Sequence, residues 1–99
     1  MTFVTTQPEM LTSAAGELQG IGAAMAAQNA AVAAPTTGVI PAAADEVSAL
    51  TAARFASHAQ TYQAVSAQAA AIHKMFVNVL SASAGSYAAT EAANATAAL

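Results

Sequence analysis

Three prolines, at positions 8, 35 and 41, divide the chain into two long proline-free stretches. Alanine dominates both stretches, and it has the highest intrinsic helix propensity of any residue. No alternating run typical of a strand and no Asn-Gly or Asp-Gly turn competes with this pattern. The sequence therefore predicts an all-α fold, with one helix at about 8–34, a loop at 35–41 and a second helix at about 42–84.

The predicted helix ends rest on local signals. Pro8 suits the first turn of a helix, whereas Thr6 and Glu9 have the spacing of a capping box that begins about one residue earlier. Gly85 is predicted to cap the second helix at its C-terminus. The tail from 86 to 99 is small and polar, and we expect it to be loosely ordered or to begin helically. This gives a helical hairpin domain at 1–85 and a C-terminal tail at 86–99.

Apolar residues recur at heptad spacing on both helices, in two lines offset by three and four residues, which is typical of a coiled-coil seam. Two such seams joined by a short loop predict an antiparallel two-helix hairpin. Only 24 of the hydrophobic residues are larger than alanine, and a lone hairpin leaves half of each helix in water. We therefore expect the seam residues to pack against each other and against a partner chain: Leu11, Leu18, Ile21, Met25, Phe55, Tyr62, Val65, Ile72, Phe76 and Val79.

Composition excludes several classes of function. The chain has no cysteine, and only Arg54 and Lys74 are cationic within a net charge of -3, so disulfides, thiolate metal sites and nucleic-acid binding are not expected. His58 and His73 lie ~22 Å apart on one helix and cannot share a metal ion. We expect His58 to be a polar seam residue and His73 to face solvent.

No motif for catalysis is present. Asp45 and Glu46 are adjacent, which suits the start of a helix better than a catalytic pair. The sequence contains no G-x-S-x-G elbow and no glycine-rich phosphate loop. We expect no enzymatic activity, cofactor, metal or small-molecule substrate. The start of the chain lacks the pattern of a general secretory signal, and the charge-free run from Leu18 to Ala44 is too polar for a transmembrane helix.

Tyr87 and Glu91 are the only aromatic and the only charged residue of the tail, at a spacing of four. If the tail begins helically, the two side chains share a face. Taken by itself, the pair is more consistent with a chance feature of the tail than with a functional motif.

Together these motifs resemble the mycobacterial PE family. The resemblance is carried by Pro8-Glu9, by the run from Ala34 to Ser48, and by Tyr87-Ala-Ala-Thr-Glu91, and it covers the whole chain. The chain is similar to short members that consist of the PE domain alone, especially those linked to the fifth mycobacterial type VII secretion system.

The resemblance implies a function and a localisation. It implies a heterodimer with a PPE-family protein, in which the hairpin completes an elongated four-helix bundle. It also implies export by a type VII (ESX) secretion system to the cell surface, the cell envelope or the medium, with Tyr87 and Glu91 as the secretion signal. A dedicated chaperone is expected to bind mainly the PPE partner.

A second hypothesis comes from the helices themselves. Alanine-rich helices with little charge are also consistent with a self-associating or membrane-active amphipathic hairpin. Such helices usually carry many Lys and Arg residues on the polar face, and this chain has two.

Overall fold

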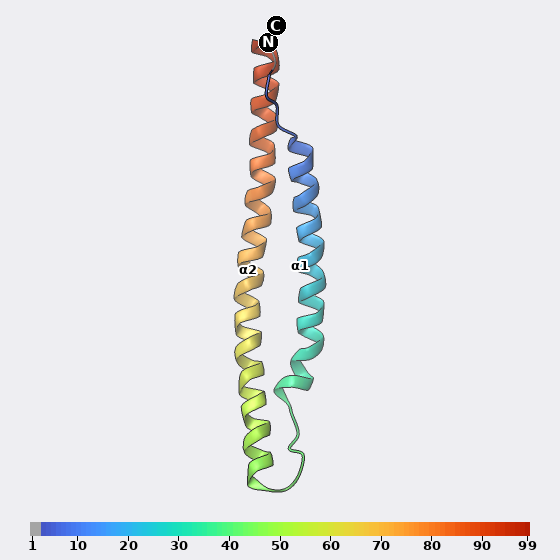
Figure 1. Cartoon of the computed structure of the whole chain (residues 1–99), viewed down its shortest axis with the longest axis vertical. Coiled ribbons are helices and arrows are strands. Elements are labelled where there is room, and N and C mark those ends of the chain that lie inside the picture. Colours follow the sequence, from blue (N-terminus) through green and yellow to red (C-terminus); the bar gives the residue numbers. More distant parts are fainter. Residues whose placement is uncertain (1–2) are drawn as a thin grey trace. The chain divides into compact units, whose positions relative to one another are not determined.

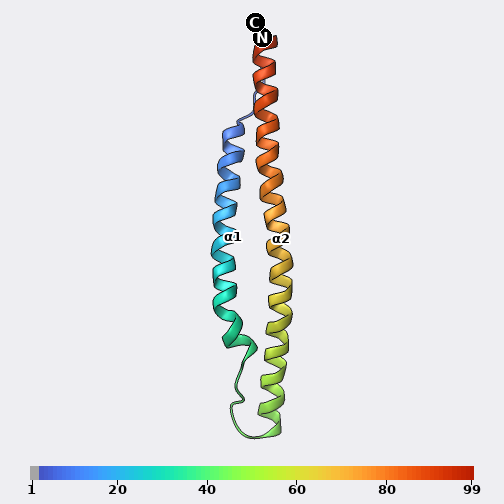
Figure 2. The same ribbon diagram turned by 180° about the vertical axis from the view of Figure 1, so that it is seen from behind.

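The computed structural model describes residues 3–99, which form two α-helices and no strand. Helix α1 runs from Pro8 to Thr37 and helix α2 from Glu46 to Ala97, and residues 38–45 connect them (Figures 1 and 2). Residues 1 and 2, with which the predicted hairpin domain begins, lie outside the described residues. The two helices confirm the predicted all-α antiparallel hairpin.

Contacts divide the chain into two compact units. The first unit joins the residues up to Gly22 with His73–Leu99, and the second unit is Ala23–Ile72. In each unit, a segment of α1 lies beside a segment of α2 that runs in the opposite direction (Figures 1 and 2). The second unit also contains the loop between the helices.

Helix α1 begins at Pro8, as the first-turn interpretation predicts, but it ends at Thr37 instead of residue 34. Pro35 lies inside the helix, where it provides no N–H for the carbonyl group four residues earlier. The Thr36 hydroxyl donates a hydrogen bond to the Val32 carbonyl at 2.6 Å, and the Thr37 hydroxyl donates one to the Ala33 carbonyl at 2.7 Å. Pro35 removes only one intrahelical donor, and the Gly38 amide still donates to the Ala34 carbonyl at 3.0 Å, so the helix continues to Thr37.

Helix α2 begins later than predicted, at Glu46 instead of about residue 42, because Asp45 caps it. The Asp45 carboxylate accepts hydrogen bonds from the Ser48 amide at 3.0 Å and from the Ser48 hydroxyl at 2.6 Å. This is the arrangement of an N-cap residue, whose side chain bonds an otherwise unpaired amide of the first turn.

Helix α2 also continues far beyond its predicted end, to Ala97 instead of residue 84. Gly85 does not act as a C-cap, since no described glycine has the positive φ that this role requires. A glycine within a helix costs about 1 kcal/mol relative to alanine. Seven of the fourteen residues from 86 to 99 are alanine, and their propensity offsets that cost. The expectation of a loosely ordered tail is therefore wrong for residues up to 97.

The core of each unit is formed by alanine. Ala15 and Ala84 are the buried hydrophobic residues of the first unit, and Ala52 and Ala59 are those of the second. No large side chain is fully buried among the described residues. The fully buried contacts within each unit are therefore made by small side chains, and most of the larger apolar residues remain accessible to solvent.

Candidate functional site

Tyr87 and Glu91 lie one turn apart on α2, because the helix continues through this region. Their side chains have different surroundings. Glu91 is half-buried and contacts the segment that precedes α1, whereas Tyr87 is 48% exposed. The pair that the sequence marks as a motif therefore consists of one anchored residue and one accessible residue.

Glu91 is held by Thr6, which lies 85 positions earlier in the chain. One oxygen of the carboxylate, Oε1, accepts a hydrogen bond from the Thr6 amide at 2.8 Å and another from the Thr6 hydroxyl at 2.9 Å. Hydrogen bonds to a charged acceptor are stronger than neutral ones. The residues just before α1 run along the C-terminal turns of α2 in both views (Figures 1 and 2).

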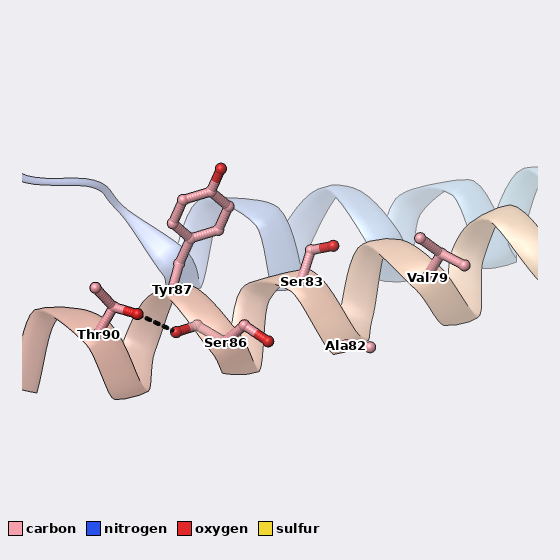
Figure 3. A pocket seen from close by; sticks show the side chains of 6 residues that line it. All are labelled: Val79, Ala82, Ser83, Ser86, Tyr87 and Thr90. Atoms are coloured by element: carbon pink, nitrogen blue, oxygen red, sulfur yellow. Dashed lines mark hydrogen bonds between the residues drawn. The ribbon is translucent and has the colours of Figure 1, made fainter.

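Tyr87 lines a shallow hollow of about 360 Å³ on α2, together with Val79, Ala82, Ser83, Ser86 and Thr90. Its ring stands away from the helix and its hydroxyl points outward (Figure 3). The neighbouring side chains are small, and the Thr90 hydroxyl donates a hydrogen bond to the Ser86 carbonyl at 3.0 Å. The phenol ring therefore projects beside a surface that presents little side-chain bulk of its own.

Pro8 and Glu9, the motif near the start of the chain, form the first turn of α1. Pro8 is half-buried, and Glu9 is exposed near the positive end of the helix dipole. Because α1 begins at Pro8, the cap position belongs to Gln7, whose carbonyl accepts from the Met10 amide at 3.0 Å, and not to Thr6 as the T-x-x-E spacing predicts. The sequence gives no signal for the contact of Thr6 with Glu91, since the two residues are far apart along the chain.

In the first unit, the helices meet at a close contact between Gly22 and His73. A Cβ atom at position 22 would lie 2.8 Å from two atoms of the His73 ring, so only glycine leaves room for the imidazole. The ring nitrogen Nε2 lies 2.7 Å from the Leu18 carbonyl oxygen, and because a carbonyl only accepts, Nε2 carries the proton and donates. The expectation that His73 faces solvent is wrong, because glycine allows the ring to approach the α1 backbone.

The second unit is held by polar contacts to Asn29. The Tyr62 hydroxyl donates to the Asn29 side-chain oxygen at 2.7 Å. The side-chain amide of Gln63 donates to the backbone carbonyl of Asn29 at 3.0 Å. The heptad pattern of apolar residues does not predict a contact at Asn29 or Gln63, since both residues are polar.

The contact surface of α2 toward α1, here called the hairpin face, consists mainly of small and polar residues that are buried or half-buried. In the second unit it comprises Ala52, Ala56, Ala59, Gln63 and Ser66, and in the first unit His73, Val77, Leu80, Ala84 and Glu91. The spacing of three and four residues is that of a heptad seam. The hairpin therefore has a heptad seam on α2. Its residues follow those of the seam that the apolar pattern predicts by one position.

The predicted seam residues of α2 form a separate, exposed surface, here called the apolar face: Phe55, Tyr62, Val65, Ile72, Phe76 and Val79. Each precedes a hairpin-face residue by one position, which is a rotation of about 100° around the helix. Their exposed fractions range from 47% to 67%. The expectation that they are buried against α1 is therefore not met within this chain, although Tyr62 reaches α1 through its hydrogen bond to Asn29.

On α1, the predicted residues divide between two environments. Leu11 and Leu18 are half-buried, whereas Ile21 and Met25 are exposed. Ile21 precedes the half-buried Gly22 by one residue, the same offset as on α2. Two antiparallel helices are related by a two-fold axis perpendicular to the plane that contains both helix axes. Rotation about this axis keeps each side of that plane in place, so residues that precede a contact residue by one position lie on the same side of both helices. In the first unit, Ile21 therefore lies on the same side as Phe76.

The chemistry of the charged groups is simple. Hydrogen bonds from Ser48, first from its hydroxyl and then from its amide, lower the pKa of the Asp45 carboxyl below its usual range. Residues 3–99 contain no group of three or more His, Cys, Asp or Glu side chains that could hold a metal ion. In the same residues, neither helix combines the length and the hydropathy needed to cross a membrane.

Comparison with known proteins identifies relatives over nearly the whole chain. The family model described as "PE family" matches residues 4–94. The chain is 68% identical over 98 residues to PE family protein PE13 of Mycobacterium tuberculosis (strain ATCC 25618 / H37Rv), and the match covers 99% of both chains. It is 61% identical to PE family protein PE8 of the same strain, with 99% of this chain and 36% of PE8 covered.

A further relative is longer still. The chain is 60% identical over 95 residues to PE-PGRS family protein PE_PGRS33 of Mycobacterium tuberculosis (strain CDC 1551 / Oshkosh), and the match covers 96% of this chain and 20% of that protein. The chain thus corresponds to nearly all of PE13 but to only a part of PE8 and PE_PGRS33.

Proposed function

Because this chain belongs to the PE family of mycobacteria, we propose that it is a non-enzymatic helical subunit of a heterodimer with a PPE-family protein. In this proposal, two helices of the partner cover the apolar face and complete a four-helix bundle. The complex is exported through a type VII secretion system to the cell surface or beyond. Its chaperone binds mainly the PPE chain.

The observation that carries this proposal is the exposed apolar face of α2. A helix in a four-helix bundle contacts two neighbours through surfaces on different sides of the helix. Here one surface is used by the hairpin, and the other presents large apolar side chains about 100° away. Covering the exposed parts of its six side chains would contribute on the order of 6 kcal/mol, at about 1 kcal/mol each. That contribution is comparable with the whole stability of a small domain, which is about 5–15 kcal/mol.

Further support comes from the placement of the exposed residues. Ile21 on α1 and Phe76 on α2 lie on the same side of the first unit, so partner helices can contact both helices at once. The alanine-rich hairpin face has little apolar surface left to bury, because its small side chains are already in contact. A partner, rather than a rearrangement of the hairpin, is the simplest way to remove the exposed apolar surface from water.

Co-expression with candidate PPE proteins tests the pairing. We expect a soluble complex with a mass that corresponds to one copy of each chain, measured by size-exclusion chromatography with light scattering. The chain expressed alone is expected to aggregate or to unfold without a cooperative transition. A stable, cooperatively melting monomer of the chain alone would show that no partner is required.

Self-association is the second candidate, because a second copy of the chain would cover the same exposed apolar residues. A homo-oligomer of defined mass that does not exchange for a PPE protein would favour it. Flotation of the isolated chain with lipid vesicles tests the membrane-active form of this hypothesis. We expect the chain to stay at the bottom of the gradient and not to rise with the vesicles.

Export is tested separately at Tyr87. Its ring is accessible on α2 beside a hollow lined by small residues, which supports its proposed role in recognition. We expect Tyr87→Ala to leave partner binding unchanged and to abolish secretion into the culture medium. Normal secretion of this variant would remove the signal assignment and leave the pairing proposal intact.

A further inference from the structure

The two residues of the proposed secretion signal are held differently. Tyr87 projects outward from α2, whereas Glu91 is half-buried and turned toward the segment before α1 (Figure 3 for Tyr87). A carboxylate that accepts two hydrogen bonds from one residue has less freedom to bind an external group than an unpaired one. The geometry therefore gives Glu91 a task within the folded chain.

That task involves Thr6. Both donors of Thr6, its amide and its hydroxyl, bond the same oxygen of Glu91, at 2.8 and 2.9 Å. The two hydrogen bonds connect the segment before α1 to α2, one turn beyond Tyr87. Within the first unit, they are the hydrogen bonds that join this segment to α2 in the described residues.

We infer that Thr6 is part of the export element, as a positioning residue that holds Glu91 and the segment before α1 beside Tyr87. The inference rests on the proposed export function. It makes the signal a three-dimensional feature of the folded first unit, with Tyr87 as the accessible group and with Thr6 and Glu91 as its support. A linear reading of Tyr87 and Glu91 does not include Thr6.

Side-chain substitutions separate a supporting role of Glu91 from recognition of its charge. Glu91→Gln keeps an acceptor oxygen at the same position but removes the charge, whereas Glu91→Ala removes both. If Glu91 supports Thr6, the Gln variant is exported at close to the normal level and the Ala variant is not. Loss of export in Glu91→Gln equal to that in Glu91→Ala, with the Thr6 amide still protected, would show that the charge itself is recognised and would overturn the supporting role.

At position 6, Thr6→Val keeps the shape of the side chain and removes the hydroxyl donor, and Thr6→Ser restores the donor. Thr5→Val is the matched control, since Thr5 is an exposed neighbour. We expect Thr6→Val to reduce secretion about fivefold while the complex with the partner forms normally. Thr6→Ser and Thr5→Val should be secreted like the unchanged chain.

Hydrogen exchange of the purified partner complex provides a readout that does not depend on export. We expect exchange of the amide of residue 6 to increase about tenfold in Glu91→Ala and about fivefold in Thr6→Val, and to stay unchanged in Tyr87→Ala. Normal export and unchanged exchange in Thr6→Val would overturn the inference. If Tyr87→Ala and Glu91→Ala are both exported normally, the assignment of the export signal to these residues is wrong, whatever the exchange at residue 6.

Discussion

Two faces of helix α2 differ in nearly every respect although they are one residue apart. The hairpin face is built mainly of alanine and small polar residues and is buried or half-buried, whereas the apolar face carries Phe, Tyr, Ile and Val and is largely exposed. Most of the larger apolar side chains of α2 lie outside the hairpin face, and Val77 and Leu80 are the exceptions that it includes. The difference indicates that small residues hold the hairpin together and that the large ones are available for another chain.

The largest effect is expected on the apolar face. Phe76→Glu should weaken partner binding at least a hundredfold, about 2.7 kcal/mol, because it would bury an unpaired charge in the interface. The helical content of the chain should change little, since the side chain is exposed within it. Isothermal titration or competition between tagged chains measures the affinity.

The matched control is Ala67→Glu. Ala67 is exposed and lies about 180° around α2 from the apolar face, so the same charge there should leave binding unchanged. Equal weakening by both substitutions would mean that the two sides of α2 are not distinguished by the partner.

An opposite change tests the hairpin face. Ala59→Leu adds three carbon atoms at a buried contact and should destabilise the complex by about 1–3 kcal/mol through overpacking. Ala67→Leu adds the same atoms at an exposed site and should have little effect. Thermal unfolding of the partner complex, followed by circular dichroism, measures the difference. If the two variants unfold at the same temperature, the small-residue contact at position 59 is not required.

A pair of glycines sharpens the comparison further. Gly22→Ala places a Cβ 2.8 Å from the His73 ring, whereas Gly20 has nothing within 4 Å of the corresponding position. Alanine gains about 1 kcal/mol of helix propensity at each site. In the complex with the partner, we expect Gly20→Ala to stabilise by up to that amount and Gly22→Ala to destabilise by about 1 kcal/mol, because the steric conflict exceeds the gain.

His73→Ala should abolish the penalty at position 22. In that background Gly22→Ala and Gly20→Ala should change the melting temperature in the same direction. A stabilising Gly22→Ala in the otherwise unchanged chain would show that the imidazole is not packed on α1.

The smallest effect concerns pH at the start of α2. Hydrogen bonds from Ser48 lower the Asp45 pKa in the folded chain, so the carboxylate contributes stability above its unfolded pKa of about 3.9. That contribution is lost as the pH falls through the lower, folded value. Asp45→Ala should therefore be less stable than the unchanged chain at neutral pH, and in acid the difference should shrink to that between the Asp45→Asn and Asp45→Ala variants, because a protonated carboxyl still offers a capping oxygen.

Asp45→Asn keeps a capping oxygen without a titrating group and serves as the control. Acid titration of the three chains, followed by circular dichroism, measures the effect. A difference between the Ala variant and the unchanged chain that keeps its neutral-pH size below pH 2 would show that the ionised carboxylate adds nothing to the cap.

The sequence predicts the number and type of the elements because proline placement and alanine content act locally. It also identifies large apolar residues at heptad spacing and expects them to pack both within the hairpin and against a partner, whereas those on α2 are largely exposed in this chain. Periodicity detects large apolar side chains, and alanine, which occurs 32 times, gives no contrast between faces. The true hairpin face includes Gln63 and Ser66, which a search for apolar residues omits.

The remaining differences between the predicted and the observed structure have two origins. Some helices continue through residues that usually end them, and one contact joins residues that are far apart along the chain. Helix α1 continues past Pro35, which removes only one intrahelical donor, and the alanines of α2 offset the cost of Gly85 within that helix. The contact of Thr6 with Glu91 joins residues 85 positions apart, and nothing local to either of them indicates it.

Site-specific photocrosslinking tests most directly the claim that the apolar face is covered by a partner. A benzophenone amino acid is placed at Phe76 on the apolar face or at Ala67 on the opposite side of α2, and the chain is co-expressed with its PPE protein. We predict a crosslink to the second protein from position 76 and none from position 67. Crosslinks of equal yield from both positions, or crosslinks from position 76 only to another copy of the same chain, would contradict the account.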